Sequence, residues 1–284
     1  MSRNVLIPLD GSPLAEDILP QLGRLALEPD LEWLLFRVCP LRVLPGIDHA
    51  PPIRDDHLVR EAMHYVDSVA HRLRLAGRRV RGRVVQADDP AQAILSCADE
   101  EESSLIALST HGRSGVTRVI LGSTAENVLR AAHAPLLLAR SFARPSKSTP
   151  FRNLVLPVVG SPLSCSAATA LLAFVKGVDA RVTLVHVLED KAPAPHWQIP
   201  GDPLGEVEKR LRAALLPVET EIRSGDPTEE ILKVCRGRDA DLLVMSTHGR
   251  TGPARWLLGS VTESVLRETP LPMLVVPAAA APRS

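Results

Sequence analysis

The sequence has few aromatic residues and no excess of either charge, and both absences restrict what the protein can be. Aromatic residues make up 3% of the 284 residues, so the core must consist mainly of Val, Leu, Ile and Ala, which suits packed layers of strands and helices. Lysine and arginine together number 33, as do aspartate and glutamate, so the formal net charge is zero. A balanced surface exerts no long-range attraction on nucleic acid or anionic membranes, and we expect neither as a partner.

The cysteines and the N-terminal segment exclude further classes of protein. The four cysteines are too far apart for a CxxC pair, a zinc-ligand spacing or a dense disulfide framework: Cys39, Cys97, Cys165 and Cys235. The first apolar run is interrupted by Pro8 and ended by Asp10, which makes it too short for a signal peptide or a membrane span. We therefore expect a cytoplasmic protein with reduced thiols.

Two motifs occur twice in the chain. Residues 3–14 (RNVLIPLDGSPL) reappear at 152–163 as RNLVLPVVGSPL, and STHGR at 109–113 reappears at 246–250. The offset between the copies falls from 149 in the first match to 137 in the second, so the second copy is 12 residues shorter. This loss falls between the second and third strands of the second copy, where the first copy has the longer helix.

The repeat divides the chain into two homologous domains. About half of the aligned positions are identical between residues 107–140 and 244–277, without a gap. Residues 141–150 (SFARPSKSTP) have the composition of a linker. The expected domains are therefore residues 1–142 and 150–278.

Apolar runs alternate with stretches of helical periodicity in both copies. Several runs are apolar throughout, which is typical of parallel strands covered on both faces. The expected strands are Val5–Leu9, Trp33–Val38, Val80–Gln86, Leu105–Ser109 and Leu136–Ala139, then Leu154–Val158, Val182–Val187, Val218–Arg223, Leu242–Ser246 and Met273–Val276. Helices are expected over Leu14–Leu27, Ile53–Ala76, Ala91–Glu102 and Ser123–Ala132. This alternation predicts an α/β fold of two Rossmann-like, doubly wound domains, each a five-stranded parallel sheet flanked by helices.

A glycine-rich loop follows the fourth strand of each copy. In the first copy, Ser109 to Gly115 leads to Gly122 and Ser123, where a helix begins. Glycines let backbone N–H groups approach an anion closely, and the first turn of a helix favours a phosphate. Alternatively, the glycines only turn the chain and Ser123 only caps the helix. The repetition of the whole loop, while nearby core positions differ, favours an anion site in at least one copy.

Two patterns in the chain resemble the universal stress protein family. One is STHG followed, after nine residues, by GS, and it lies between an expected strand and the sequence ExVLR. The other is VLIPLDGS at the first expected strand. The resemblance covers nearly the whole chain as two tandem domains. It implies the adenine nucleotide alpha hydrolase-like version of the fold and an ATP ligand, with magnesium as a possible companion. It also implies that the two domains pair through their last strands within one chain, as a pseudo-dimer, and it leaves a homodimer open.

The resemblance also assigns candidate binding residues. In the first copy Asp10 would contact the nucleoside, the backbone of Val38 the adenine edge, and Gly112, Gly122 and Ser123 the phosphates. The loop and first helical turn add Ser109, His111, Arg113, Gly115 and Thr124. The second copy offers Val187, Gly249, Gly252, Gly259 and Ser260.

The two copies differ where the nucleoside would bind. Asp10 corresponds to Val159, which cannot accept a hydrogen bond. Losing one hydrogen bond to a charged group, roughly 1.5–3 kcal/mol, weakens binding about ten- to a hundredfold. Two lesser departures from the family pattern remain. Both copies have a serine, Ser109 or Ser246, where the family has the first glycine of the loop. The first copy also has Asp88 before its Asp-Pro pair, where the family usually has a glycine and the second copy has Gly225. We expect the first copy to bind ATP and the second to bind it weakly or not at all.

The loop histidines, His111 and His248, invite a catalytic role. Neither has a carboxylate or a metal-ligand spacing nearby, so a histidine that hydrogen-bonds the loop backbone is the simpler interpretation. Arg113 and Arg250 suit a phosphate or a surface carboxylate equally. The chain lacks a Walker A lysine and the SGGxDS loop of ATP pyrophosphatases. The resemblance therefore implies an ATP-binding regulatory protein with slow hydrolysis at most. One alternative is an interaction module that does not use a nucleotide. An adenylating or phosphotransfer enzyme is a less well supported alternative.

Overall fold

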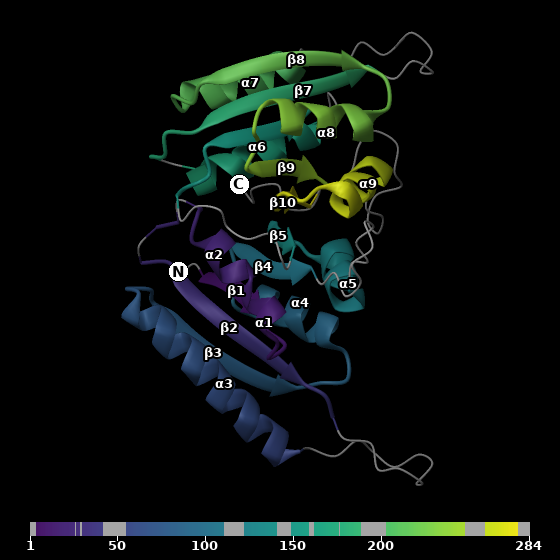
Figure 1. Ribbon diagram of the computed structural model, residues 1–284. Helices are drawn as coiled ribbons and strands as arrows, with labels where there is room; N and C mark the ends of the chain where they lie inside the picture. Colours follow the sequence, from purple (N-terminus) through teal and green to yellow (C-terminus); the bar gives the residue numbers. More distant parts are fainter. Residues whose placement is uncertain are drawn as a thin grey trace.

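The computed structural model describes residues 4–25, 27–28, 30–41, 55–110, 122–140, 149–158, 162–175, 177–188, 203–247 and 259–277 (Figure 1). The first half of the chain forms β1 (Asn4–Pro8), α1 (Pro13–Glu16), α2 (Ile18–Leu22), β2 (Glu32–Cys39), α3 (Asp56–Leu75), β3 (Val80–Gln86), α4 (Pro90–Glu100), β4 (Leu105–Thr110), α5 (Ser123–Ala131) and β5 (Leu136–Arg140). The second half forms β6 (Asn153–Pro157), α6 (Pro162–Val175), β7 (Arg181–Leu188), α7 (Pro203–Ala213), β8 (Val218–Ser224), α8 (Pro227–Gly237), β9 (Leu242–Ser246), α9 (Ser260–Glu268) and β10 (Met273–Val276).

All of these strands belong to one ten-stranded sheet. Their order is β3-β2-β1-β4-β5-β10-β9-β6-β7-β8, so the second half of the sheet mirrors the order of the first. Within each half the strands are parallel, which confirms the predicted α/β fold. The halves meet where β5 pairs antiparallel with β10, Leu137 opposite Leu274. The expected pairing of last strands is therefore made within one chain.

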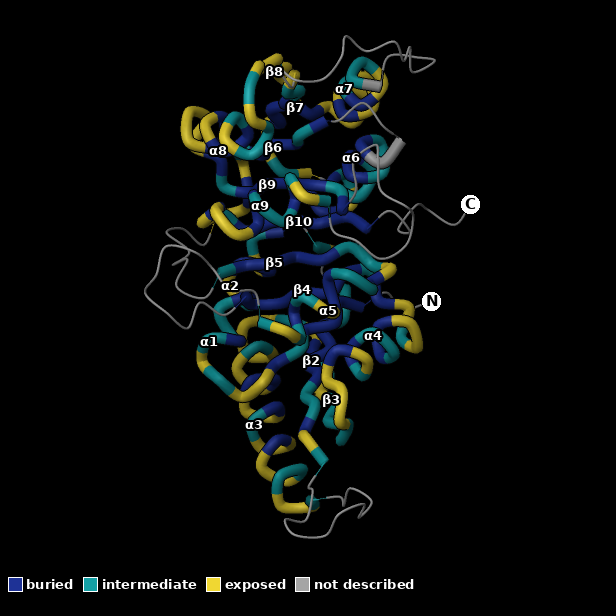
Figure 2. Tube along the Cα trace, turned by 90° about the vertical axis from the view of Figure 1, so that its right-hand side faces the viewer, coloured by how far each residue is buried: buried dark blue, intermediate teal, exposed yellow. Residues whose placement is uncertain are grey.

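Helices cover both faces of the sheet, and each face has its own apolar core. Helices α1, α2, α3, α6 and α7 bury their apolar residues against one face, and α4, α5, α8 and α9 against the other. Figure 2 shows the buried strands running through the centre, with exposed positions mainly on the outer helices. Within the described residues, no helix combines the length and apolarity needed to cross a membrane.

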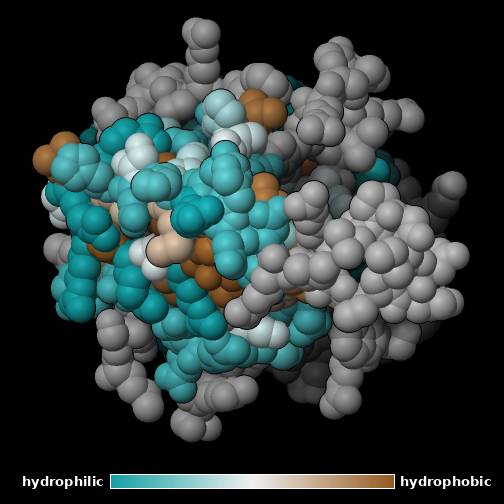
Figure 3. All heavy atoms as spheres, turned by 90° about the horizontal axis from the view of Figure 1, so that it is seen from below, coloured by the Kyte–Doolittle hydropathy of each residue, from teal (hydrophilic) through white to brown (hydrophobic). Residues whose placement is uncertain are grey.

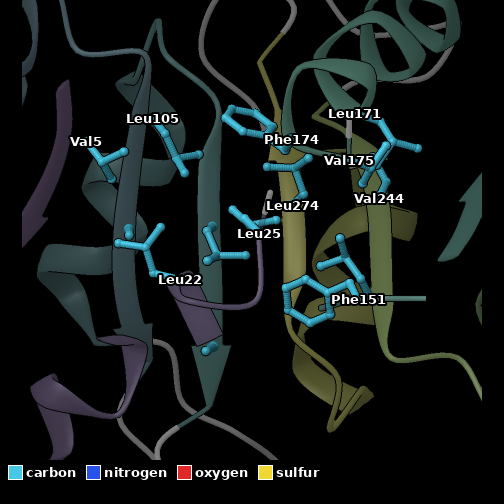
Figure 4. Packing of buried hydrophobic residues seen from close by; sticks show 14 of the residues in the cluster. Val5, Leu22, Leu25, Leu105, Phe151, Leu171, Phe174, Val175, Val244 and Leu274 are labelled. Atoms are coloured by element: carbon cyan, nitrogen blue, oxygen red, sulfur yellow. The ribbon is translucent and has the colours of Figure 1, made fainter. Parts of the chain in front are cut away.

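Both apolar cores run through the boundary between the halves. One of them joins Leu22 and Leu25 of the first half to Phe151, Phe174 and Leu274 of the second (Figure 4). Side chains along β5 alternate between the two cores, which explains why this strand is apolar at every position but its last. The halves therefore fold against each other as one body rather than as separate units on a linker.

The shorter second copy differs mainly at one helix. Helix α3 has 20 residues and α7 has 11, as expected from the place of the loss. One further residue is missing before α8. The amides of Ala87 and Gly225 make the same hydrogen bond, to the carbonyls of Cys39 and Leu188, both 3.0 Å. Gly225 therefore matches Ala87 by its hydrogen bond and Asp88 by its place directly before the N-cap aspartate, so this turn of the first copy holds one extra residue.

Arginine–glutamate networks cover the two outer strands, β3 and β8, and the strand carries the arginines in one network and the glutamates in the other. On β3 the strand supplies the arginines, and Arg81 and Arg83 pair with Glu101 after α4. On β8 the strand supplies the acids, and Arg238 after α8 pairs with Glu219 and Glu221. Figure 3, a view of the end formed by α3 and β3, shows mainly hydrophilic residues around a smaller hydrophobic area. Charged side chains of this kind discourage an outer strand from pairing with another chain.

Candidate functional site

The strand order reverses beside the first strand of each half, so a crevice is expected at the carboxyl ends of β1 and β4, and again at β6 and β9. In Figure 1 the arrowheads of β2 and β3 and those of β7 and β8 lie on the right-hand side, so both crevices face the same side of the molecule. The loops that follow these strands carry the predicted site residues.

The turn after β1 fixes Asp10 at the mouth of the first crevice. The Asp10 Oδ1 atom accepts a hydrogen bond from the Ser12 amide at 2.8 Å. Ser12 in turn caps α1, because its Oγ accepts the Ala15 amide at 3.2 Å. Gly11 between them has φ = +82°, a conformation that other residues rarely adopt. The sequence DGS is thus a preformed turn that presents an exposed carboxylate.

Arg37 supports this turn from β2. Its Nη1 donates to the Leu9 carbonyl at 3.4 Å, and its guanidinium lies 3.3–3.5 Å from where a Cβ of Gly11 would stand. In the second half His186 occupies the equivalent position, with its Nδ1 2.8 Å from the Val158 carbonyl. Arg37 was not among the residues predicted for the site, although a charge inside an otherwise apolar run was the signal that could have found it.

A polar contact also joins α1 to α3 below the turn. The Tyr65 hydroxyl donates to Glu16 Oε1 at 3.0 Å, and Arg72 pairs with the other carboxylate oxygen at 2.5 Å. Burial, and then the nearby carboxylates of Glu16 and Asp10, raise the pKa of Tyr65. The second half has Cys165 at the position of Glu16. The second half therefore lacks this tyrosine–glutamate contact, and its own polar contact between the corresponding helices joins Arg210 to Thr169.

The start of α5 is built as the phosphate motif predicts, with one correction. Gly122 is the N-cap residue, with φ −60° and ψ 144°, and Ser123 is the first residue of the helix. The helix therefore begins at Ser123, as expected, and the expectation that Ser123 caps it is wrong, because the cap is the residue before it. A glycine offers no side-chain oxygen to the first N–H groups, which leaves them suited to an anion. Gly259 and Ser260 repeat this arrangement at α9.

The remaining candidates are placed as follows. Val38 and Val187 hold equivalent positions near the ends of β2 and β7, and both pack against the same apolar core. Ser109 is buried at the end of β4, while Ser123 is exposed and Thr124 half-buried. The other candidates lie outside the described residues: His111, Gly112, Arg113, Gly115, Gly249 and Gly252. Within the described ranges, no group of three or more His, Cys, Asp or Glu side chains could hold a metal ion.

Three buried side-chain atoms of the described chain have no hydrogen-bond partner: Arg37 Nε, Ser109 Oγ and Arg140 Nε. All three are donors, all belong to the first half, and they stand at or near the carboxyl ends of β2, β4 and β5. The corresponding residues of the second half are His186, Ser246 and Pro277, of which the proline has no side-chain donor. An unsatisfied buried polar group costs about 1–3 kcal/mol, so each of these three atoms calls for an explanation.

Comparison with known proteins gives one consistent answer. The profile of the universal stress protein family matches residues 1–140 and 150–277. A universal stress protein of Methanocaldococcus jannaschii is 33% identical over 139 residues, which cover 44% of this chain and 82% of that protein. One from Mycobacterium tuberculosis H37Rv is 25% identical over 250 residues, 81% of this chain and 75% of that protein.

Solved structures agree with the sequence comparison over the full length. The crystal structure of a universal stress protein from Archaeoglobus fulgidus superposes with a TM-score of 0.77 at 25% identity, covering 98% of this chain and 99% of that one. The overall fold of the chain is therefore shared with a solved relative. On the fold, the repeated motif and these matches, the chain belongs to the universal stress protein family and carries two tandem domains of that family.

Proposed function

We propose that this protein is a regulatory nucleotide-binding protein that takes up ATP in the crevice of its first half. The observation that carries the proposal is the set of three unpartnered buried donors, Arg37 Nε, Ser109 Oγ and Arg140 Nε. They stand near the edge of the sheet where nucleotides bind in doubly wound folds, Arg37 and Ser109 on the face of Leu35 and Ala107, and Arg140 on the opposite face with Leu138. A polyanionic, oxygen-rich ligand supplies the acceptors that such donors need.

Each part of the crevice suits one part of ATP. Asp10, an exposed carboxylate held by the Ser12 amide, would accept a hydrogen bond from the nucleoside. Val38, beside it on β2, would line the adenine. The phosphates would lie against Ser109, the loop residues His111, Gly112, Arg113 and Gly115, and the start of α5 at Gly122, Ser123 and Thr124. Magnesium, if it accompanies the nucleotide, would be held mainly by the phosphates themselves.

The second half would be the weaker site. It keeps the phosphate motif through Gly249, Gly252, Gly259 and Ser260, and Val187 at the adenine position. It has Val159 in place of Asp10 and Pro277 in place of Arg140. Both replacements remove polar side-chain groups. The second half therefore keeps the glycines of the phosphate motif but lacks the carboxylate and the guanidinium that would select a nucleotide in the first half.

The proposal extends to organisation and location. We place the domains at residues 1–142 and 150–278, and the protein in the cytoplasm. All four cysteines are free thiols, three of them buried, and burial raises the pKa of Cys97 to about 11 and of Cys235 to about 12. Such thiols are protonated and unreactive at neutral pH, which suits a reducing compartment.

Release of bound nucleotide tests the proposal directly. Purified protein is denatured with acid and the supernatant is analysed by anion-exchange chromatography, while stripped protein is titrated with ATP by calorimetry. We expect ATP in the supernatant, saturable binding to the stripped protein, and turnover slow enough for intact ATP to survive purification. Neither release nor binding of any adenine nucleotide would overturn the proposal and leave a nucleotide-independent interaction module.

A further inference from the structure

Arg140 stands at the boundary between the first crevice and the second half of the chain. It is the last residue of β5 and pairs in register with Thr110, the last residue of β4, after which the phosphate loop begins. Its Nη2 donates to the Arg267 carbonyl at 2.6 Å. Arg267 lies in the last turn of α9, a helix of the other half. Arg140 therefore connects the edge of one crevice to a helix of the neighbouring domain.

The charge of Arg140 has no counter-charge in the part of the chain that the structure describes. Among the described residues no carboxylate pairs with its guanidinium, whereas Arg130 and Arg267 pair with Glu126 and Glu263. Its Nε is buried without a partner, and burial lowers the pKa of Arg140. A guanidinium stays protonated at physiological pH, and a partly buried cation without an anion is unfavourable.

The geometry of a guanidinium allows it to serve two partners at once. It carries five N–H donors in one plane, so one Nη2 hydrogen can hold the Arg267 carbonyl while the Nε hydrogen is left for an oxyanion. The pseudo-symmetric position, Pro277, can do neither. This combination of donors exists beside one crevice and not the other.

We propose that Arg140 binds the terminal phosphates of the nucleotide in the first crevice, and thereby ties that ligand to helix α9 of the second half. The proposal rests on the proposed function for the identity of the ligand. The chemical class is a chain of phosphate groups, because the unpartnered donor adjoins the phosphate loop at Thr110 rather than the nucleoside turn at Asp10. Arg140 thus selects the triphosphate over the nucleoside.

Calorimetric titration with three probes tests the proposal: adenosine, ATP and inorganic triphosphate. The variants are Arg140→Gln, Arg140→Lys and, as a matched control, Arg130→Gln. The control removes the same charge from α5, where Arg130 pairs with Glu126 on the same helix. We expect Arg140→Gln to weaken ATP and triphosphate about tenfold and to leave adenosine unchanged, the size expected for one charge-assisted hydrogen bond. Arg140→Lys restores part of the loss, and Arg130→Gln causes none.

The outcomes separate this proposal from the proposed function. If Arg140→Gln binds ATP and triphosphate as the unchanged protein does, Arg140 is not a phosphate ligand, although ATP binding stands. If the unchanged protein binds triphosphate through Arg140 but neither adenosine nor ATP, the anion site stands and the proposed function fails. If it binds none of the three probes, both fail. Hydrogen exchange gives a further readout, because ATP should protect the last turn of α9 in the unchanged protein and not in Arg140→Gln.

Discussion

The guanidinium of Arg24 lies 3.1 Å from the carboxylate of Asp241, and this ion pair joins the two halves of the chain. The Arg24 side chain is only 10% exposed and lies 4.0 Å over the ring of Phe151. It also donates to the Thr149 carbonyl at 3.0 Å, while Asp241 accepts the amide of Arg152. Both charges are thus hydrogen-bonded on several sides, which distinguishes this pair from ordinary surface pairs.

Replacing Arg24 by Ala should destabilise the protein by about 2 kcal/mol, because it leaves the Asp241 carboxylate without its cation and uncovers Phe151. The urea midpoint of unfolding measures this loss. The matched control is Arg267→Ala, which breaks a pair whose side chains are 49% and 35% exposed and should cost under about 0.5 kcal/mol. Equal losses from the two variants would show that Arg24 does not hold the halves together.

Tyr65 is the only tyrosine of the sequence, so its ionisation can be followed by absorbance near 295 nm without interference from other phenols. Burial and the Glu16 carboxylate raise its pKa, so we expect little ionisation in the folded protein at pH 10, where a free tyrosine is about half ionised. Because the folded state favours the protonated phenol, this contribution to stability is present below about pH 10 and is lost as pH rises above it.

The Glu16→Gln variant isolates the carboxylate's part in this shift. Removing the negative charge beside the phenol should move the Tyr65 titration towards lower pH, while the burial of the ring remains. The urea-unfolded protein, which should titrate near pH 10, provides the reference. An identical titration in the folded and unfolded protein is the result that excludes the Tyr65–Glu16 contact.

Asp10 and Gly249 test the expected inequality of the two crevices. Asp10→Ala should weaken ATP binding about ten- to a hundredfold, because it removes a charged acceptor from the better site. Gly249→Ala, in the second half, should change total affinity little. Asp10→Asn keeps an acceptor for the Ser12 amide, so it separates loss of the nucleoside contact from collapse of the turn. Equal losses from Asp10→Ala and Gly249→Ala would contradict the inequality.

The opposite polarity of the two outer strands suggests a charge-exchange experiment. Glu101→Arg places a third cation beside Arg81 and Arg83 and should destabilise the protein by about 1–2 kcal/mol. Adding Arg81→Glu should restore part of the loss, because the pair then has the polarity that Glu219 and Arg238 have at the other end of the sheet. A double variant no more stable than Glu101→Arg alone would mean that this pair does not contribute.

The pH dependence of the β3 pair follows from the same contact. Hydrogen bonding to Arg81 lowers the pKa of Glu101, so its stabilisation is present above the ordinary glutamate pKa of about 4.3. It is lost as pH falls through the lower value of the folded state. Acid unfolding of Glu101→Gln, compared with the unchanged protein, should therefore show a smaller decline in stability below about pH 4.

Local sequence features determined the fold and the place of the phosphate motif. Fully apolar runs such as Leu105–Ala107 predict strands covered on both faces, and the repeat predicts two equal halves, because both signals come from residues close together in the chain. Even so, the N-cap of α5 was misassigned, although its first residue, Ser123, was predicted correctly. Gly122 rather than Ser123 forms the N-cap, and cap geometry depends on how the preceding chain approaches the helix.

Only the tertiary structure decided which side chains meet. Arg24 and Asp241 are 217 positions apart, and no periodicity links two residues at that distance. Arg37 and Arg140 read as ordinary charges near strand ends until folding buries their Nε atoms without partners. Burial and hydrogen-bond satisfaction are properties of the assembled sheet and its helices. The sequence therefore determined that the two copies differ at Asp10 and Val159, whereas only the tertiary structure decided which buried donors are left without partners.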